Sequence, residues 1–172
     1  QLAPGLIAAQ PPVSPPRGGL VIPSRVHQVI GLRLERLSPA AYRLAGLAVV
    51  IGREFNYPVL QATSQLSHST LLDLLDELVR AYLIEETGAG YRFRHGLIRQ
   101  VLYDELTTHR RIWLHGQVVQ ALERLFVGQS KEQAAVFVYH YERAERYEIA
   151  FHYLIRAGDQ AQTTYALREA VD

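Results

Sequence analysis

Apolar residues recur at helical spacing through the first third of the chain. They predict one helix over residues 24–37, beginning at the capping residue Ser24, and a second over residues 40–51. Ser38 followed by Pro39 is the favoured order of cap and proline at a helix start. The second helix is apolar on nearly every side, so we expect it to form the centre of the core.

The next long helix is expected to be amphipathic. A short helix after Pro58 leads into residues 70–82, which Ser67 or Ser69 caps. Leucines and charged residues then alternate between two faces at helical spacing. The side chains expected inside are Leu71, Leu72, Leu74, Leu75, Leu78 and Val79, and those expected outside are Asp73, Asp76, Glu77 and Arg80.

Two strands are predicted over residues 83–87 and 91–94, where apolar and polar residues alternate. The glycine-rich residues 88–90 between them are typical of a β-hairpin turn. Three helices followed by a two-stranded hairpin is the order of a winged-helix domain. We place that domain at residues 23–108.

The chain after the hairpin is expected to be helical. The fold class is therefore mainly α: a winged-helix domain with a small β-hairpin, followed by antiparallel helical repeats over residues 109–172. The predicted helices span residues 97–106, 109–126, 132–146 and 148–162, and a last one begins near Tyr165. This tail resembles an incomplete tetratricopeptide-like (TPR-like) repeat in the placement of Ala134, Phe137, Tyr141, Ala150, Leu154 and Ala157.

Composition and charge limit the partners and the kinds of protein that this chain can represent. Residues 1–22 are rich in proline and predict a linker, which we expect to lead in from an upstream domain. The chain of 172 residues carries a net charge of +1, which implies neither a nucleic acid nor a membrane as partner. It has no cysteine, which excludes disulfides and fits a cytoplasmic protein. It begins with Gln1 and lacks methionine, so we expect a piece of a longer polypeptide.

The candidate binding residues lie where the hairpin gives way to a helix. Residues 91–99 change from strand-like alternation to helical spacing, and His95 stands at the change. An imidazole beside the unpaired amides of a helix start could bind an anion such as a nucleotide phosphate. Arg94 and Arg99 add positive potential, and Gly96 would let the anion approach closely. The chain has no P-loop, so this fragment alone is expected to hold no cofactor.

The stretch from Ile22 to about Leu125 resembles the region that follows the ATPase core in STAND-type signalling ATPases. These are large bacterial transcriptional regulators and cyclase-linked proteins with a P-loop domain, a winged helix and helical repeats. Each matching piece is weak alone, but their order and spacing agree over roughly a hundred residues. The pieces are residues 22–23, 36–38, 48–55, 75–78, 91–95, 98–99, 110–111 and 113–115.

The resemblance implies a role for His95. In that family the winged helix carries a histidine at the end of its wing that contacts the phosphate of bound ADP and holds the protein closed. By position this residue is His95, while relatives usually have an acidic residue where Gly96 stands. The implied parent protein binds ATP or ADP, and the partners are an upstream nucleotide-binding domain in cis and a protein or small-molecule inducer on the repeats. This chain would sense the nucleotide state and relay it to the repeats for signal or transcriptional regulation.

Two alternatives use the same fold. A winged-helix regulator could bind DNA directly, but the helix that would enter the groove exposes mainly Asp73, Asp76 and Glu77, which would repel phosphates. The chain could also be a protein-interaction scaffold in which only the repeats matter. The basic residues 109–111 are expected to form a solvated or ion-paired helix start.

Catalysis and metal binding find no support in the sequence. There is no nucleophile elbow and no metal-binding helix motif, and Ser67-His68-Ser69 is expected to be a local capping cluster. His140, His152 and Glu142 lack metal-ligand spacing and are expected to pack within the repeat. We therefore expect a non-catalytic module without a metal, although its parent could hydrolyse ATP through another domain.

Overall fold

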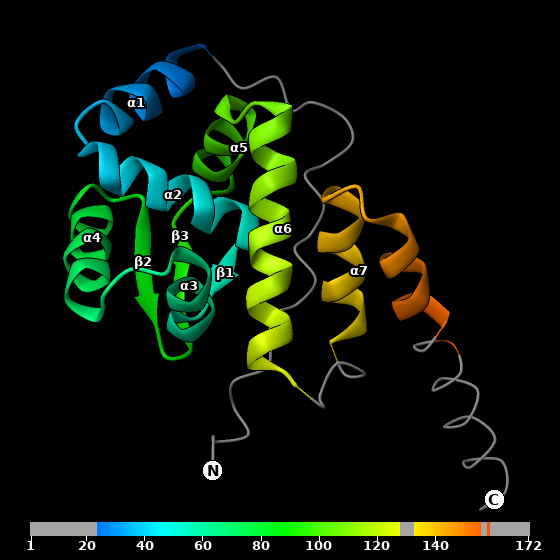
Figure 1. Cartoon of the computed structure of the whole chain (residues 1–172). Coiled ribbons are helices and arrows are strands. Elements are labelled where there is room, and N and C mark those ends of the chain that lie inside the picture. Colours follow the sequence, from blue (N-terminus) through cyan, green and yellow to red (C-terminus); the bar gives the residue numbers. More distant parts are fainter. Residues whose placement is uncertain (1–23, 128–132, 156–157, 159–172) are drawn as a thin grey trace, which may run out of the picture.

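The computed structural model describes residues 24–127, 133–155 and 158. This part of the chain is mainly helical, with one small three-stranded antiparallel sheet. In Figure 1, α6 stands between the sheet with its surrounding helices and a second helical group that begins with α7. In chain order the elements are α1 Ser24–Leu34, α2 Pro39–Ile51, β1 Glu54–Phe55, α3 Tyr57–Ser64, α4 His68–Arg80, β2 Ile84–Thr87, β3 Gly90–Phe93, α5 Gly96–Glu105, α6 Thr108–Leu125 and α7 Ala134–Arg143.

The central helix α2 begins and ends as the sequence predicts. Ser38 is its N-cap, and the Ser38 hydroxyl accepts a hydrogen bond from the amide of Ala41 at 3.1 Å. Gly52 follows its last residue. Nine of its residues are buried, and α2 packs against α3, α4, α5 and α6. The preceding helix α1 ends at Leu34, short of the predicted residue 37.

The sheet contains a strand that the sequence pattern did not reveal. The expected hairpin is present as β2 and β3, but β1 pairs with the other side of β3, so the strand order is β1-β3-β2. The expectation of a two-stranded sheet was wrong because β1 has only two residues, too few for alternation to show. Phe55 is buried, and its ring stacks on Tyr91 with centroids 6.0 Å apart.

Gly90 is required where β3 meets β1. Its φ of +148° is rare for residues with a side chain, and a Cβ on Gly90 would lie 2.5 Å from the carbonyl oxygen of Phe55. Glycine therefore allows the two backbones to approach closely.

The amphipathic helix α4 follows the prediction at its start and departs from it at two side chains. Ser67 is the N-cap and accepts a hydrogen bond from the amide of Thr70. Leu72 was expected inside, but 38% of it is exposed because the buried face is formed by Leu71, Leu74, Leu75 and Leu78.

Glu77 was expected outside, but its carboxylate binds Ser38 at the start of α2. It accepts hydrogen bonds from the Ser38 amide at 2.6 Å and the Ser38 hydroxyl at 2.9 Å. The ion pair between Asp76 and Arg80, by contrast, lies on the surface as predicted.

The helices after the sheet are also close to prediction. Thr107 caps α6. A further helix spans residues 147–155, and it lies antiparallel to α7 (Figure 1). Ala134, Phe137, Tyr141 and Ala150 are buried, whereas 49% of Leu154 is exposed. The proposed linker at residues 1–22, the helix near Tyr165 and Ala157 lie outside the described residues. None of the described helices is both long enough and apolar enough to cross a membrane.

Candidate functional site

His95 lies at the junction between β3 and α5. Its backbone is extended, with φ −136° and ψ 138°, and it occupies the N-cap position of α5. The carbonyl of His95 accepts the first hydrogen bond of the helix, from the amide of Ile98 at 3.1 Å. The imidazole makes no capping hydrogen bond, and the residue is exposed. The ring is therefore presented to solvent beside a helix start, in the place that the sequence predicted.

Gly96 is the first residue of α5 and is exposed. A Cβ added to it would meet no described atom within 4 Å. Neither packing nor an unusual φ therefore requires glycine here, in contrast to Gly90. The open surface beside His95 allows a large group to approach the start of α5.

The charges beside His95 are partly neutralised by Glu85 of β2. Arg92 donates a hydrogen bond from its Nε to Glu85 at 2.6 Å, and an Nη of Arg94 lies 3.8 Å from the same carboxylate. The hydrogen bond from Arg92 lowers the pKa of Glu85, and the charges of Arg94 and His95 act in the same direction. Arg94 also lies over the ring of Tyr82, 5.3 Å from its centroid. The junction is thus a mixed-charge surface rather than a purely cationic one.

Arg99 is engaged on the side of α5 that faces α7. Burial lowers its pKa, while Tyr139 of α7 is close enough to oppose that effect through a hydrogen bond. The sequence placed Arg99 with Arg94 around one anion site. The structure brings Arg94 and His95 together with Glu85 and engages Arg99 with Tyr139.

The helices α6 and α7 enclose a pair of buried histidines that the sequence pattern does not indicate. The Nδ1 atoms of His115 on α6 and His140 on α7 are 2.8 Å apart, and the two residues are 0% and 1% exposed. The Nε2 of His115 lies 3.2 Å from the hydroxyl of Tyr103 on α5. Two Nδ1 atoms can share a hydrogen bond only if one is protonated and the other is not, so the rings hold different tautomers when neutral.

Burial keeps both of these rings uncharged. It lowers the pKa of His115 to about 3, with the charges of Arg143, Arg111 and Arg99 adding to the effect. Burial also lowers the pKa of His140 well below its usual value. The sequence gives no pattern that pairs residues 25 positions apart, so only their location on apolar helix faces could have suggested burial. No group of three or more potential metal-ligating side chains occurs in the described part of the chain.

The basic residues at the start of α6 have structural contacts. Arg111 donates hydrogen bonds to the backbone carbonyls of Tyr103 and Asp104, and Arg110 lies over the ring of Trp113, 4.5 Å from its centroid. In the Ser67-His68-Ser69 cluster, Ser67 caps α4 and His68 contacts the hydroxyl of Tyr57 at 2.6 Å. Both groups therefore take part in local structure.

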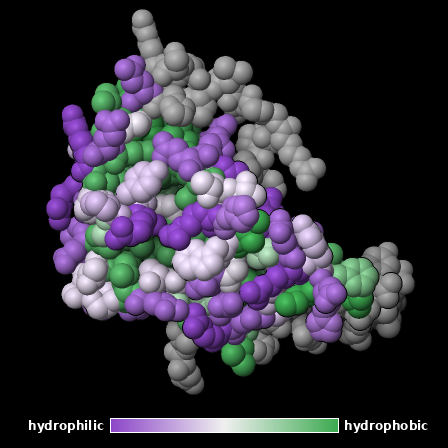
Figure 2. All heavy atoms as spheres, turned by 45° about the horizontal axis from the view of Figure 1, so that its top comes forward, coloured by the Kyte–Doolittle hydropathy of each residue, from purple (hydrophilic) through white to green (hydrophobic). Residues whose placement is uncertain are grey.

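Figure 2 shows one face of the molecule, on which hydrophilic residues are interspersed with smaller hydrophobic areas.

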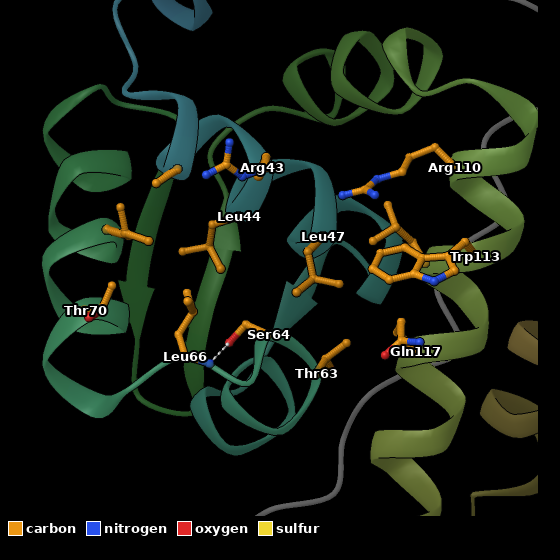
Figure 3. Close-up of a pocket in the computed structure, with 13 residues that line it drawn as sticks. Arg43, Leu44, Leu47, Thr63, Ser64, Leu66, Thr70, Arg110, Trp113 and Gln117 are labelled. Atoms are coloured by element: carbon orange, nitrogen blue, oxygen red, sulfur yellow. Dashed lines mark hydrogen bonds between the residues drawn. The ribbon is translucent and has the colours of Figure 1, made fainter.

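A groove is present between α2, α4 and α6, and Figure 3 shows Leu44 and Leu47 inside it, with Trp113 projecting from α6. This groove could not be predicted from the sequence pattern, because its lining residues are spread over five segments of the chain. Comparison of the chain with known protein families, curated proteins and solved structures found no match.

Proposed function

We propose that this chain is the non-catalytic regulatory region of a STAND-like ATPase, with a winged helix followed by the first TPR-like helices. The order of its elements supports this proposal. A helix–strand–helix–helix arrangement followed by two further strands is the order of a winged helix, and the three-stranded sheet with β1 is consistent with that order. The helix pair formed by α7 and residues 147–155 supports the start of a repeat array.

The proposed sensor is His95, and one observation carries its assignment: an exposed imidazole without a capping bond stands directly before α5. Such a ring is available to donate a hydrogen bond to an anionic group on another domain. The positive end of the helix dipole favours that contact. The open surface at Gly96 leaves room for the other domain to approach.

The proposed mechanism is a shift between two packings. With ADP in an upstream nucleotide-binding domain, His95 would contact a phosphate and hold the winged helix against that domain. Exchange for ATP would release it, and the change would pass through α5 and α6 to the repeats. The parent's nucleotide is ATP or ADP, and its inducer is a protein or small molecule. The residues described here serve as the relay.

The test is His95→Ala in the intact protein. We expect faster loss of bound ADP and higher basal activity, measured by nucleotide release and by the output of the parent protein. His109→Ala is the matched control, because His109 is another exposed histidine at a helix start. If His95→Ala and His109→Ala retain ADP equally, the sensor assignment fails.

The charges of α4 favour the proposed regulatory function over direct DNA binding. Asp73 and Asp76 are exposed on it, and its Arg80 is paired with Asp76. The carboxylate of Glu77 is not free on that face, since it accepts a hydrogen bond from the amide of Ser38. A salt-dependent gel-shift assay separates the two functions, because phosphate-driven binding weakens steeply with salt.

A further inference from the structure

The groove between α2, α4 and α6 has the composition of a small binding site. Its volume is about 220 Å³. At ~30 Å³ for each water molecule, this is room for roughly seven waters, or for an apolar body of about six to eight carbon atoms. Leucines line much of its interior: Leu44, Leu47, Leu66, Leu74 and Leu114. The groove is therefore suited to a ligand smaller than typical drug-sized molecules.

The two charged side chains of the groove are both cationic and lie along one edge. In Figure 3, Arg43 from α2 and Arg110 from α6 occupy the upper edge, while Thr63, Ser64 and Leu66 lie along the opposite edge. None of the described residues that line the groove is acidic. An elongated ligand would thus meet positive charge at one end and an apolar environment along its body.

The acids nearest in sequence to Arg110 are already engaged elsewhere. Glu105 accepts a hydrogen bond from the hydroxyl of Tyr42 at 2.5 Å, and Asp104 pairs with Arg111 at 3.8 Å. The bond to Glu105 raises the pKa of Tyr42 to about 12, so Tyr42 remains a donor to this carboxylate at neutral pH. Within the described residues, neither Arg43 nor Arg110 forms an ion pair.

The other polar side chains of the groove are mostly satisfied locally. The hydroxyl of Thr63 donates to the carbonyl of Val59 at 2.7 Å, and Ser64 interacts with Gln61 and Leu66. Thr70 contacts the capping hydroxyl of Ser67 at 2.8 Å. The charged donors available to a ligand are therefore the guanidinium groups at the upper edge, and Gln117 adds a neutral amide to the lining.

Trp113 forms the side of the groove that belongs to α6. It is 51% exposed, although tryptophan is usually highly buried. The guanidinium of Arg110 lies over its ring, which fixes both side chains next to the apolar interior. Tryptophan and arginine are two of the residue types enriched at the hot spots of binding interfaces.

We propose that this groove binds a small monocarboxylate with an apolar body, such as a medium-chain or aryl carboxylate. The carboxylate is held between Arg43 and Arg110, and the body lies on the leucines against Trp113. Charge complementarity selects an anion over a neutral or cationic molecule of the same shape. This site is separate from His95 and does not depend on the proposed relay function.

Trp113 provides a direct measurement, because it is the only tryptophan of the chain. Octanoate is titrated into the full chain while the emission of Trp113 is followed. We expect a saturable change with a dissociation constant below about 1 mM. Octan-1-ol and octylammonium also have eight carbon atoms but carry neutral and cationic heads, and we expect each to bind at least about tenfold more weakly, which corresponds to about 1.4 kcal/mol.

The variants locate the head group. Arg43→Gln should weaken octanoate at least about tenfold without altering the emission of the free protein, since the guanidinium over the Trp113 ring belongs to Arg110. Arg80→Gln on the surface of α4 is the charge-matched control and should bind octanoate as the unmodified chain does. The proposal is overturned if octanoate produces no saturable change, if octan-1-ol binds as well, or if Arg43→Gln and Arg80→Gln bind octanoate equally.

Discussion

The sheet-containing region, residues 24–106, and the junction between α6 and α7 are held together by different means. In the first region leucines fill the core, and helix caps such as Ser38 and Ser67 use polar groups at element ends. At the α6–α7 junction the polar groups lie inside: His115 and His140 pair in the buried interface. At the exposed edge of the same junction, Glu123 on α6 accepts hydrogen bonds from Tyr141 of α7 and from Tyr153.

The difference has a thermodynamic consequence. An apolar contact tolerates small shifts, because dispersion and burial are not directional. A buried hydrogen bond fails when either partner is lost, and the remaining group is left without water. We therefore expect the α6–α7 junction to be more sensitive to single substitutions and to pH than the region of residues 24–106.

The largest effect is expected from His140→Ala. The change leaves the Nδ1 of His115 without its partner and opens a cavity beside α6, so we expect the free energy of unfolding to fall by about 3–5 kcal/mol. Urea unfolding measures it. The exposed His109→Ala is the control and should lie within about 0.5 kcal/mol of the unmodified chain. A loss below about 1 kcal/mol for His140→Ala would contradict a tightly packed junction.

Lowering the pH should act on the same junction. The folded pKa of His115 is about 3, below the unfolded value of ~6.5, so between these values the unfolded chain binds a proton that the folded chain does not. Stability is therefore full above about pH 7 and is lost as pH falls. His115 alone should lower the free energy of unfolding by about 2 kcal/mol between pH 7.5 and 5.

The matched measurement for pH uses the double variant His115→Asn and His140→Asn. Its free energy of unfolding should depend much less on pH over this interval, because asparagine does not titrate there. His109→Asn should retain the original dependence. An unchanged slope in the double variant would show that other groups cause the loss of stability.

Gly90→Ala probes the tightest backbone contact in the first region. The new Cβ would lie 2.5 Å from the carbonyl oxygen of Phe55, at a φ that alanine rarely adopts. We expect a loss of about 2 kcal/mol, measured by thermal unfolding. Gly96→Ala should cost far less, since a Cβ there meets no described atom. An equal loss of stability in the two variants would mean that the close backbone contact between β1 and Gly90 does not require glycine.

Glu77→Ala should give the smallest of these effects. It removes the two hydrogen bonds that the carboxylate accepts from Ser38, and we expect a loss of about 1–1.5 kcal/mol in urea. Asp73→Ala changes an exposed carboxylate on the same helix and should have little effect. If both variants unfold at the same urea concentration, Glu77 does not anchor α2.

Much of the first region could be predicted, because its signals are local. Ser38-Pro39, the leucine spacing of α4 and the glycine-rich turn each specify structure within a few residues. Strand β1 could not be predicted, since two residues are too few to show alternation and its residue Glu54 pairs with Arg92, 38 positions along the chain. The position of His95 before α5 was predicted, whereas its mixed-charge surroundings depend on β2 pairing with β3.

The groove and the histidine pair escaped prediction for a common reason. Each unites side chains from separate helices, and the sequence does not tell which helix faces lie opposite one another. The buried face of α4 is a further example, in which the sequence does not settle the position of a single residue. Leu71, Leu72, Leu74 and Leu75 all suit an inward position, and only the packing against α2 decides that Leu72 lies outside.

The bond between Glu77 and Ser38 fixes the rotation of α4 about its own axis. Successive residues of an α-helix are separated by about 100° around the axis, so a one-residue rotation would carry Glu77 away from Ser38 and replace Leu71 by Leu72 in the core. The same rotation would bring Asp76 to the buried position of Leu75, so apolar packing also opposes it. The carboxylate of Glu77 and the leucine face therefore specify the same rotation, and together they determine which side chains of α4 any partner meets.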